Sequence, residues 1–130
     1  MKRMFLVLAA SVAALAPFGT TPSVLASPKP DPAQCFRTPR MSNWASYDDR
    51  VINVKLQTGA VFQVTLVGAC PGLGLNQTMA FDTSFKDQVC DGRPATVITR
   101  SGAVPLHCAV KTVRALTREE AAALPDAQRP

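Results

Sequence analysis

Four cysteines carry the clearest chemistry in this chain, and their spacing decides which reactions are open to them. Cys90 and Cys108 are the closest pair along the sequence, 18 positions apart, and every other spacing is longer. Redox-active pairs are usually separated by two residues, so that one thiol can resolve the mixed disulfide of the other. Structural zinc sites likewise draw two ligands from each of two tight turns. The spacing therefore predicts structural disulfides, with no metal site and no cofactor.

Four cysteines allow three disulfide pairings, and the sequence does not choose among them. We prefer Cys35 with Cys108, which would tie the start of the domain to its last strand. The remaining pair, Cys70 with Cys90, would then fasten the irregular middle of the chain. In a chain-entropy treatment these two bridges would contribute roughly 4.5 and 3 kcal/mol. Such a contribution is comparable to the whole stability of a small domain.

The other residues that could do chemistry favour no catalytic site. His107 is the only histidine and adjoins Cys108 on a predicted strand, where neighbouring side chains point to opposite faces and cannot act as base and nucleophile. We expect a surface histidine, although it could still titrate near neutral pH or bind a partner. Five aspartates near predicted turns do not match the spacing of a calcium loop: Asp48, Asp49, Asp82, Asp87 and Asp91. We therefore predict turn formation for these carboxylates and no enzymatic activity.

Two features could contact a partner. Aromatic residues contribute disproportionately to recognition, and although most are needed in the core of a small domain, Trp44 is the one we single out as a contact. The second feature is a loop formed by Leu73, Gly74, Leu75 and Asn76, which follows Cys70 and could be presented rigidly by a disulfide.

The first residues have the organisation of a secretory signal peptide. Lys2 and Arg3 supply the positive start, Met4–Ala16 is apolar or small, and Ala26 closes a site that signal peptidases accept. We predict cleavage after Ala26 and a soluble protein in the periplasm or outside the cell. The apolar stretch is too short for a membrane span, which needs about 20 residues, and no later segment is long enough either.

Removal of residues 1–26 from the 130 leaves 104, which is enough for one domain. Residues 27–34 carry three prolines and are predicted to form an extended linker. We place a disulfide-stapled β domain at 35–116 and a short helix and tail at 117–130. The mature chain has 12 basic and nine acidic residues, a net charge of +3 with no basic run. Nucleic-acid binding is therefore not expected.

Two runs with a period of two predict a β-hairpin. Apolar residues alternate with polar ones from Ile52 to Leu56 and again from Phe62 to Leu66. Because residues opposite each other in an antiparallel pair share a face, a two-residue loop would mix the apolar and polar faces. A three-residue loop, Gln57–Gly59, instead pairs Val54 with Phe62. It also puts glycine at the position that needs a left-handed conformation.

The remaining pattern completes a small β domain. We expect strands over Ala95–Arg100 and from Leu106 onward, and weaker ones over Asn43–Tyr47 and Thr78–Phe81. The phase of the last strand slips after Val110, which predicts a bulge near Lys111. Thr117 and Glu120 form a capping-box pattern that starts a short helix. The predicted fold is mostly β, an antiparallel barrel or sandwich of about five to seven strands with a short C-terminal helix.

Several of these residues together resemble an uncharacterised family of small secreted bacterial proteins, domain of unknown function 6491. They are Cys35, Trp44, the Asp48-Asp49-Arg50 turn that leads into the Val51–Gln57 strand, Cys70-Pro71-Gly72-Leu73, Phe81, Cys90 and Cys108. The resemblance extends from about Cys35 to Leu116. It implies an envelope location and a framework of four cysteines, and it adds no mechanism.

Three functions are compatible with these features. The first is a non-catalytic binding or structural module of the bacterial envelope, whose partner is an envelope protein or a cell-wall component. The second is a secreted inhibitor that presents the Leu73–Asn76 loop to an envelope hydrolase. The third is a thiol enzyme or metal carrier, which would require unpaired cysteines.

Overall fold

A computed structural model describes residues 34–75 and 78–130. The predicted signal peptide, 1–26, and nearly all of the predicted linker lie outside these residues. The described part of the chain is mostly β. Its strands are β1 (Cys35–Arg37), β2 (Met41–Asp48), β3 (Val51–Leu56), β4 (Val61–Leu66), β5 (Ala80–Thr83), β6 (Gln88–Cys90), β7 (Ala95–Ser101) and β8 (Val104–Ala115). Its short helices are η2 (Thr38–Arg40), η3 (Leu73–Leu75), α1 (Arg118–Ala122) and η4 (Asp126–Gln128).

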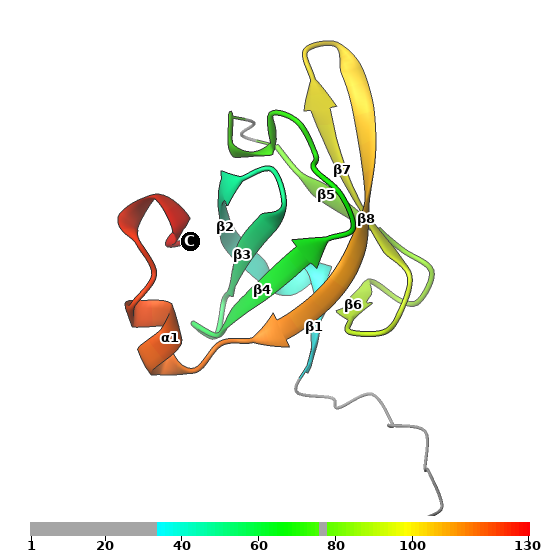
Figure 1. The fold of residues 1–130 in the computed structure, drawn as a ribbon. Coiled ribbons are helices and arrows are strands. Elements are labelled where there is room, and N and C mark those ends of the chain that lie inside the picture. Colours follow the sequence, from blue (N-terminus) through cyan, green and yellow to red (C-terminus); the bar gives the residue numbers. More distant parts are fainter. Residues whose placement is uncertain (1–33, 76–77) are drawn as a thin grey trace, which may run out of the picture.

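The strands form a curled six-stranded antiparallel sheet in the order β2-β3-β4-β8-β7-β5 and a separate ribbon of β1 and β6. The 12-residue strand β8 holds the large sheet together, because its first half pairs with β7 and its second half with β4. Figure 1 shows β8 running the length of the domain. A mostly β fold with a short C-terminal helix is thus confirmed, while the β1/β6 ribbon was not predicted.

The hairpin of β3 and β4 has the predicted register. Val54 lies opposite Phe62 and Ile52 opposite Val64, so the apolar side chains of both strands share the core face. The Leu56 amide donates to the Ala60 carbonyl at 2.8 Å, which closes the three-residue loop. Gly59 has a φ of 87°, the left-handed value for which the loop requires glycine.

The predicted bulge near Lys111 is also present. Thr65 lies opposite Thr112 and Leu66 opposite Val110, so Lys111 is an extra residue on β8. A bulge bends its strand and increases its twist. This bend lies where β8 passes from its pairing with β7 to its pairing with β4, and it helps a single strand to serve both halves of the sheet.

The disulfides are Cys35–Cys90 and Cys70–Cys108, so the preferred pairing was wrong. Cys35 lies directly opposite Cys90 in the β1/β6 ribbon. Cys70 reaches Cys108 because the chain continues along β8 after β4, where the Val67 amide donates to the Ala109 carbonyl at 2.9 Å. Both bridges therefore depend on strand pairings between residues that are far apart in sequence.

The core is closed by residues from both sheets. Phe36 of β1 is 2% exposed and contacts Phe62 of β4 and Phe81 of β5, with ring centroids 5.3 and 5.6 Å apart. Around them pack buried side chains from the large sheet and the loops, among them Ile52, Val54, Val64, Leu73, Val89, Val97 and Val113. The β1/β6 ribbon thus covers one side of the core, because Phe36 and Val89 point inward from its two strands.

The C-terminal segment packs back on the sheet. The predicted capping box of Thr117 and Glu120 is present and begins α1. Beyond α1, the Gln128 carbonyl accepts a hydrogen bond of 2.8 Å from the side-chain amide of Asn53 on β3. Asn53 is only 2% exposed although it lies on the polar face of the hairpin, because this segment covers it. Figure 1 shows the C-terminus beside β2.

Candidate functional site

The predicted contact residues have different environments. Trp44 lies on β2 opposite Val54, half-buried and packed against the core. Leu73 is fully buried in the core, so no partner can contact its side chain while the loop stays folded. Gly74 packs against the chain of β2, since a Cβ added there would lie 2.9 Å from the Ser46 carbonyl oxygen. Leu75 is 90% exposed, and Asn76 lies outside the described residues.

Two of the motifs that carried the family resemblance, the Asp48-Asp49-Arg50 turn and the Cys70-Pro71-Gly72-Leu73 segment, are in contact. Asp48 accepts hydrogen bonds of 2.8 Å from the amides of Arg50 and Val51, which shapes the turn between β2 and β3. The Asp49 carboxylate accepts from the Leu73 amide at 3.2 Å, and the Asp49 carbonyl accepts from the Cys70 amide at 2.7 Å. Both aspartates are therefore occupied in holding main chain, as the turn prediction requires.

Residues with catalytic potential do not converge in the described part of the chain. His107 is exposed on β8 and faces away from the side on which Cys108 forms its disulfide. All four cysteines are paired. Within residues 34–75 and 78–130, no cluster of three or more histidine, cysteine or acidic side chains could hold a metal ion. In the same residues, no helix is long and apolar enough to cross a membrane.

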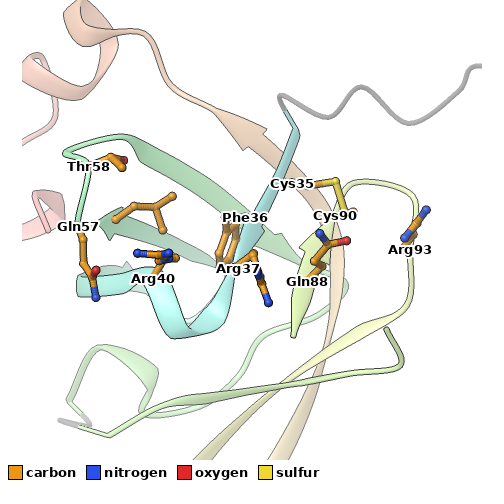
Figure 2. Close-up of a pocket in the computed structure, with 10 residues that line it drawn as sticks. Cys35, Phe36, Arg37, Arg40, Gln57, Thr58, Gln88, Cys90 and Arg93 are labelled. Carbon is orange, nitrogen blue, oxygen red and sulfur yellow. A yellow bond between two sulfur atoms is a disulfide. The ribbon is translucent and has the colours of Figure 1, made fainter. Parts of the chain in front are cut away.

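A groove beside β1 has a distinctive lining. It has a volume of about 600 Å³ and lies along β1, between this strand and the turn of the β3/β4 hairpin. It extends over the face of the ribbon that carries the Cys35–Cys90 disulfide, as Figure 2 shows. The groove is lined by Cys35, Phe36, Arg37, Arg40, Leu56, Gln57, Thr58, Gln88, Cys90 and Arg93. Its floor is thus apolar and covalently braced, and its rim is polar.

The charged residues that line the groove are all positive. Three of its residues, Arg37, Arg40 and Arg93, are exposed arginines, and none of the lining residues is acidic. The ion pairs found in the described residues involve Arg114 and Arg129, so none of the three groove arginines pairs with a described carboxylate. Figure 2 shows Arg40 beside the hairpin and Arg93 beyond Cys90. The rim is therefore suited to an anion.

An exposed aromatic residue continues the groove on the β6 side. The Arg93 guanidinium lies 5.1 Å from the ring centroid of Phe85, within the range of a cation–π contact. A second, smaller hollow lined by Phe85 shares Gln88 and Arg93 with the groove. Phe85 is 52% exposed. An apolar ligand group could therefore contact Phe85 while a charged group remains near the arginines.

This site could not be predicted from the sequence because its residues come from three separated segments, 35–40, 56–58 and 88–93. Arg37 and Arg40 flank the Thr38-Pro39 step, and this pair was the only local signal. The groove becomes recognisable only when the β1/β6 ribbon is placed beside the hairpin turn.

Comparison with known proteins bears on the whole chain. A family model described as a family of unknown function (DUF6491) matches residues 1–130. The chain belongs to the DUF6491 family. No match to this DUF6491 protein was found among curated proteins, and none among solved structures. The family supplies no activity that could be transferred to the groove, so a function has to be argued from the groove itself.

Proposed function

We propose that this DUF6491 protein is a non-catalytic binding module of the bacterial cell envelope, and that the groove beside β1 binds an anionic group of its ligand. The observation that carries the proposal is the rim of Arg37, Arg40 and Arg93, three exposed arginines around an apolar floor with no acidic residue in the lining. Arginine presents several donors in a fixed fork and is the side chain best suited to carboxylate and phosphate groups.

Two features of the fold support binding rather than chemistry. The Cys35–Cys90 bridge and buried Phe36 brace the floor of the groove, so that little order has to be gained when a ligand binds. Three of the aspartates, Asp48, Asp49 and Asp91, hold main chain through their carboxylates. Disulfides persist in oxidising compartments, which supports a location outside the cytoplasm.

The inhibitor alternative has less support. Its predicted loop would have to be presented to a hydrolase, yet Leu73 is buried and Gly74 packs on β2. Within Leu73–Leu75, only Leu75 offers an exposed side chain. A thiol or metal function would require unpaired cysteines, and all four cysteines form disulfides.

Capture of a partner from native envelope extract tests the proposal, with baits that differ in whether the groove arginines are present. Three baits are compared: the wild type, a groove variant with Arg37→Gln, Arg40→Gln and Arg93→Gln, and a control with Arg50→Gln, Lys111→Gln and Arg118→Gln. Both variants lose the same charge, and the control residues do not line the groove. We expect the wild type and the control to recover the same component and the groove variant to lose it. Equal recovery by all three, or no reproducible component, would contradict the proposal.

A further inference from the structure

The main-chain groups of β1 divide between its two edges. The Asp91 amide donates to the Gln34 carbonyl at 3.1 Å, and the Thr38 amide donates to the Asp87 carbonyl at 2.9 Å. Hydrogen-bonded and non-hydrogen-bonded pairs alternate along an antiparallel ladder. Cys35 therefore belongs to a non-hydrogen-bonded pair with Cys90, and the 4.1 Å between their Cα atoms agrees with this assignment.

The free edge of β1 follows from this alternation. Arg37 lies two residues after Cys35, so it too belongs to a non-hydrogen-bonded pair, with Gln88. The N–H and C=O groups of Cys35 and Arg37 consequently point away from β6. The other edge of β1 faces Leu56, Gln57 and Thr58 across the groove. In the sheet assignment of the described residues β1 pairs with β6 alone.

An unpaired strand edge is a template for another extended chain. On the basis of the proposed function, we propose that the ligand of the groove is an acidic peptide segment in extended conformation, which adds as a strand to the free edge of β1. Its main chain would pair with the N–H and C=O groups of Cys35 and Arg37. Its carboxylates would lie against Arg37 and Arg40, which flank the free edge, while Arg93 on the far side of β6 (Figure 2) would add only to the positive charge of the rim.

The size of the groove agrees with such a ligand. One residue of a paired strand occupies a rise of roughly 3.3 Å, a spacing of about 4.8 Å and a layer about 10 Å thick, which is roughly 160 Å³. The groove volume of about 600 Å³ therefore holds between three and four residues. β1 has three residues, so the volume is sufficient for a segment as long as the free edge, and the rest of the groove extends over the disulfide face of the ribbon.

The charge of the rim selects an acidic peptide over other extended chains. The lining contains three arginines and no carboxylate to repel a bound acid. The floor adds Leu56, which is partly exposed and can receive an apolar side chain between two acidic ones. An extended peptide with alternating glutamate and valine presents both kinds of group, because its side chains alternate between two faces.

The test uses the full mature chain with its disulfides intact and a capped hexapeptide of alternating glutamate and valine, labelled for fluorescence anisotropy. Four further probes are the same peptide with alternate amides N-methylated on either of its two edges, a lysine-for-glutamate peptide, and vesicles containing phosphatidylglycerol. We expect the parent peptide to bind and the lysine peptide not to bind. N-methylation of the pairing edge should weaken binding about tenfold or more, and methylation of the opposite edge should have little effect.

The protein variants identify the surface. Arg37→Gln and Arg40→Gln should each weaken binding of the parent peptide by up to about tenfold. Arg118→Gln, with the same loss of charge on α1, should leave binding unchanged. In amide exchange, the Cys35 and Arg37 N–H groups should gain protection when the peptide binds. Within the described residues, the side chains of Arg37, Arg40 and Arg118 form no hydrogen bond, ion pair or ring contact that these variants would remove.

Several outcomes would overturn the strand-pairing inference while leaving the proposed function intact. One is peptide binding that depends on the arginines but not on either pattern of N-methylation. Another is arginine-dependent binding of the vesicles without binding of the peptide. If neither peptide nor vesicles bind and envelope capture is independent of the arginines, the proposed function fails as well.

Discussion

Asp91 and Val113 lie 22 residues apart in sequence, and the Asp91 carboxylate accepts a hydrogen bond of 2.9 Å from the Val113 amide. This hydrogen bond satisfies a main-chain amide that the sheet leaves unpaired. β7 begins at Ala95 and pairs with β8 only as far as Ala109, so beyond the bulge this edge of β8 pairs with no described strand. Asp91 satisfies one amide of this edge, and the Gln34 side chain satisfies another, that of Ala115, at 2.8 Å.

Replacement of Asp91 by alanine tests this arrangement. Asp91→Ala removes the acceptor for the Val113 amide and should lower the free energy of unfolding by about 1–2 kcal/mol. Asp91→Asn keeps an oxygen acceptor and should cost less. Asp82→Ala is the matched control, because Asp82 is an exposed carboxylate on β5. Urea unfolding of the oxidised protein measures all three, and equal midpoints for Asp91→Ala and Asp82→Ala would contradict the assigned role.

The contact between η3 and β2 gives a second prediction. A Cβ at Gly74 would lie 2.9 Å from the Ser46 carbonyl oxygen, which is main chain and cannot move alone. Gly74→Ala should therefore destabilise the protein by about 1–3 kcal/mol, the usual cost of overpacking. Gly68→Ala is the control, because a Cβ there meets nothing within 4 Å. Thermal unfolding should separate the two variants, and a Gly74→Ala protein as stable as the wild type would show that the loop is held less closely.

The hydrogen bonds at the start of α1 lower the pKa of Glu120. The Thr117 amide donates to the Glu120 carboxylate at 2.8 Å, and Arg114 donates to it at 2.7 Å. The backbone hydrogen bond from Thr117 first, and then the hydrogen bond from Arg114, hold the pKa of Glu120 below its ordinary value of 4.5. Because the pKa is lowered on folding, the ionised carboxylate stabilises the capped helix above the ordinary pKa. This stabilisation is lost as the pH falls through the pKa of the folded protein.

An NMR titration of the Glu120 side-chain carboxyl carbon measures this directly. We expect a midpoint below 4.5 in the wild type and a higher one in Arg114→Gln. The Arg114→Gln midpoint should still lie below the ordinary value, because the Thr117 amide keeps its hydrogen bond. A wild-type midpoint at or above 4.5 would show that the capping box does not hold the carboxylate in solution.

Local patterns explain which parts of the fold could be predicted. The hairpin register, the bulge at Lys111 and the capping box each depend on residues close together in sequence, where periodicity and turn chemistry decide the geometry. The β1/β6 ribbon depends on two three-residue strands, each with a single inward residue, Phe36 or Val89. So short an alternation carries no detectable period. The disulfide pairing and the groove both depend on this ribbon, and both were missed for the same reason.

The disulfide pairing can be read from a tryptic digest, because each cysteine falls on a different peptide. Cleavage of the unreduced protein yields a peptide ending at Arg37, and Leu56–Lys86, Asp87–Arg100 and Ser101–Lys111, each with one cysteine. We expect Leu56–Lys86 to be linked to Ser101–Lys111, and the peptide ending at Arg37 to be linked to Asp87–Arg100. Linkage of the peptide ending at Arg37 to Ser101–Lys111 would restore the pairing preferred from the sequence.

The same bridges should dominate stability. Cys35–Cys90 and Cys70–Cys108 span 55 and 38 positions, and in a chain-entropy treatment each contributes about 4 kcal/mol. Paired Cys→Ala variants should therefore lower the free energy of unfolding by about 2–5 kcal/mol for either bridge. Only the loss of Cys35–Cys90 should also weaken ligand binding in the groove, because this bridge lines it and Cys70–Cys108 does not. Equal loss of binding in both variants, measured well below their unfolding midpoints, would show that the groove depends on the stability of the whole domain rather than on its own bridge.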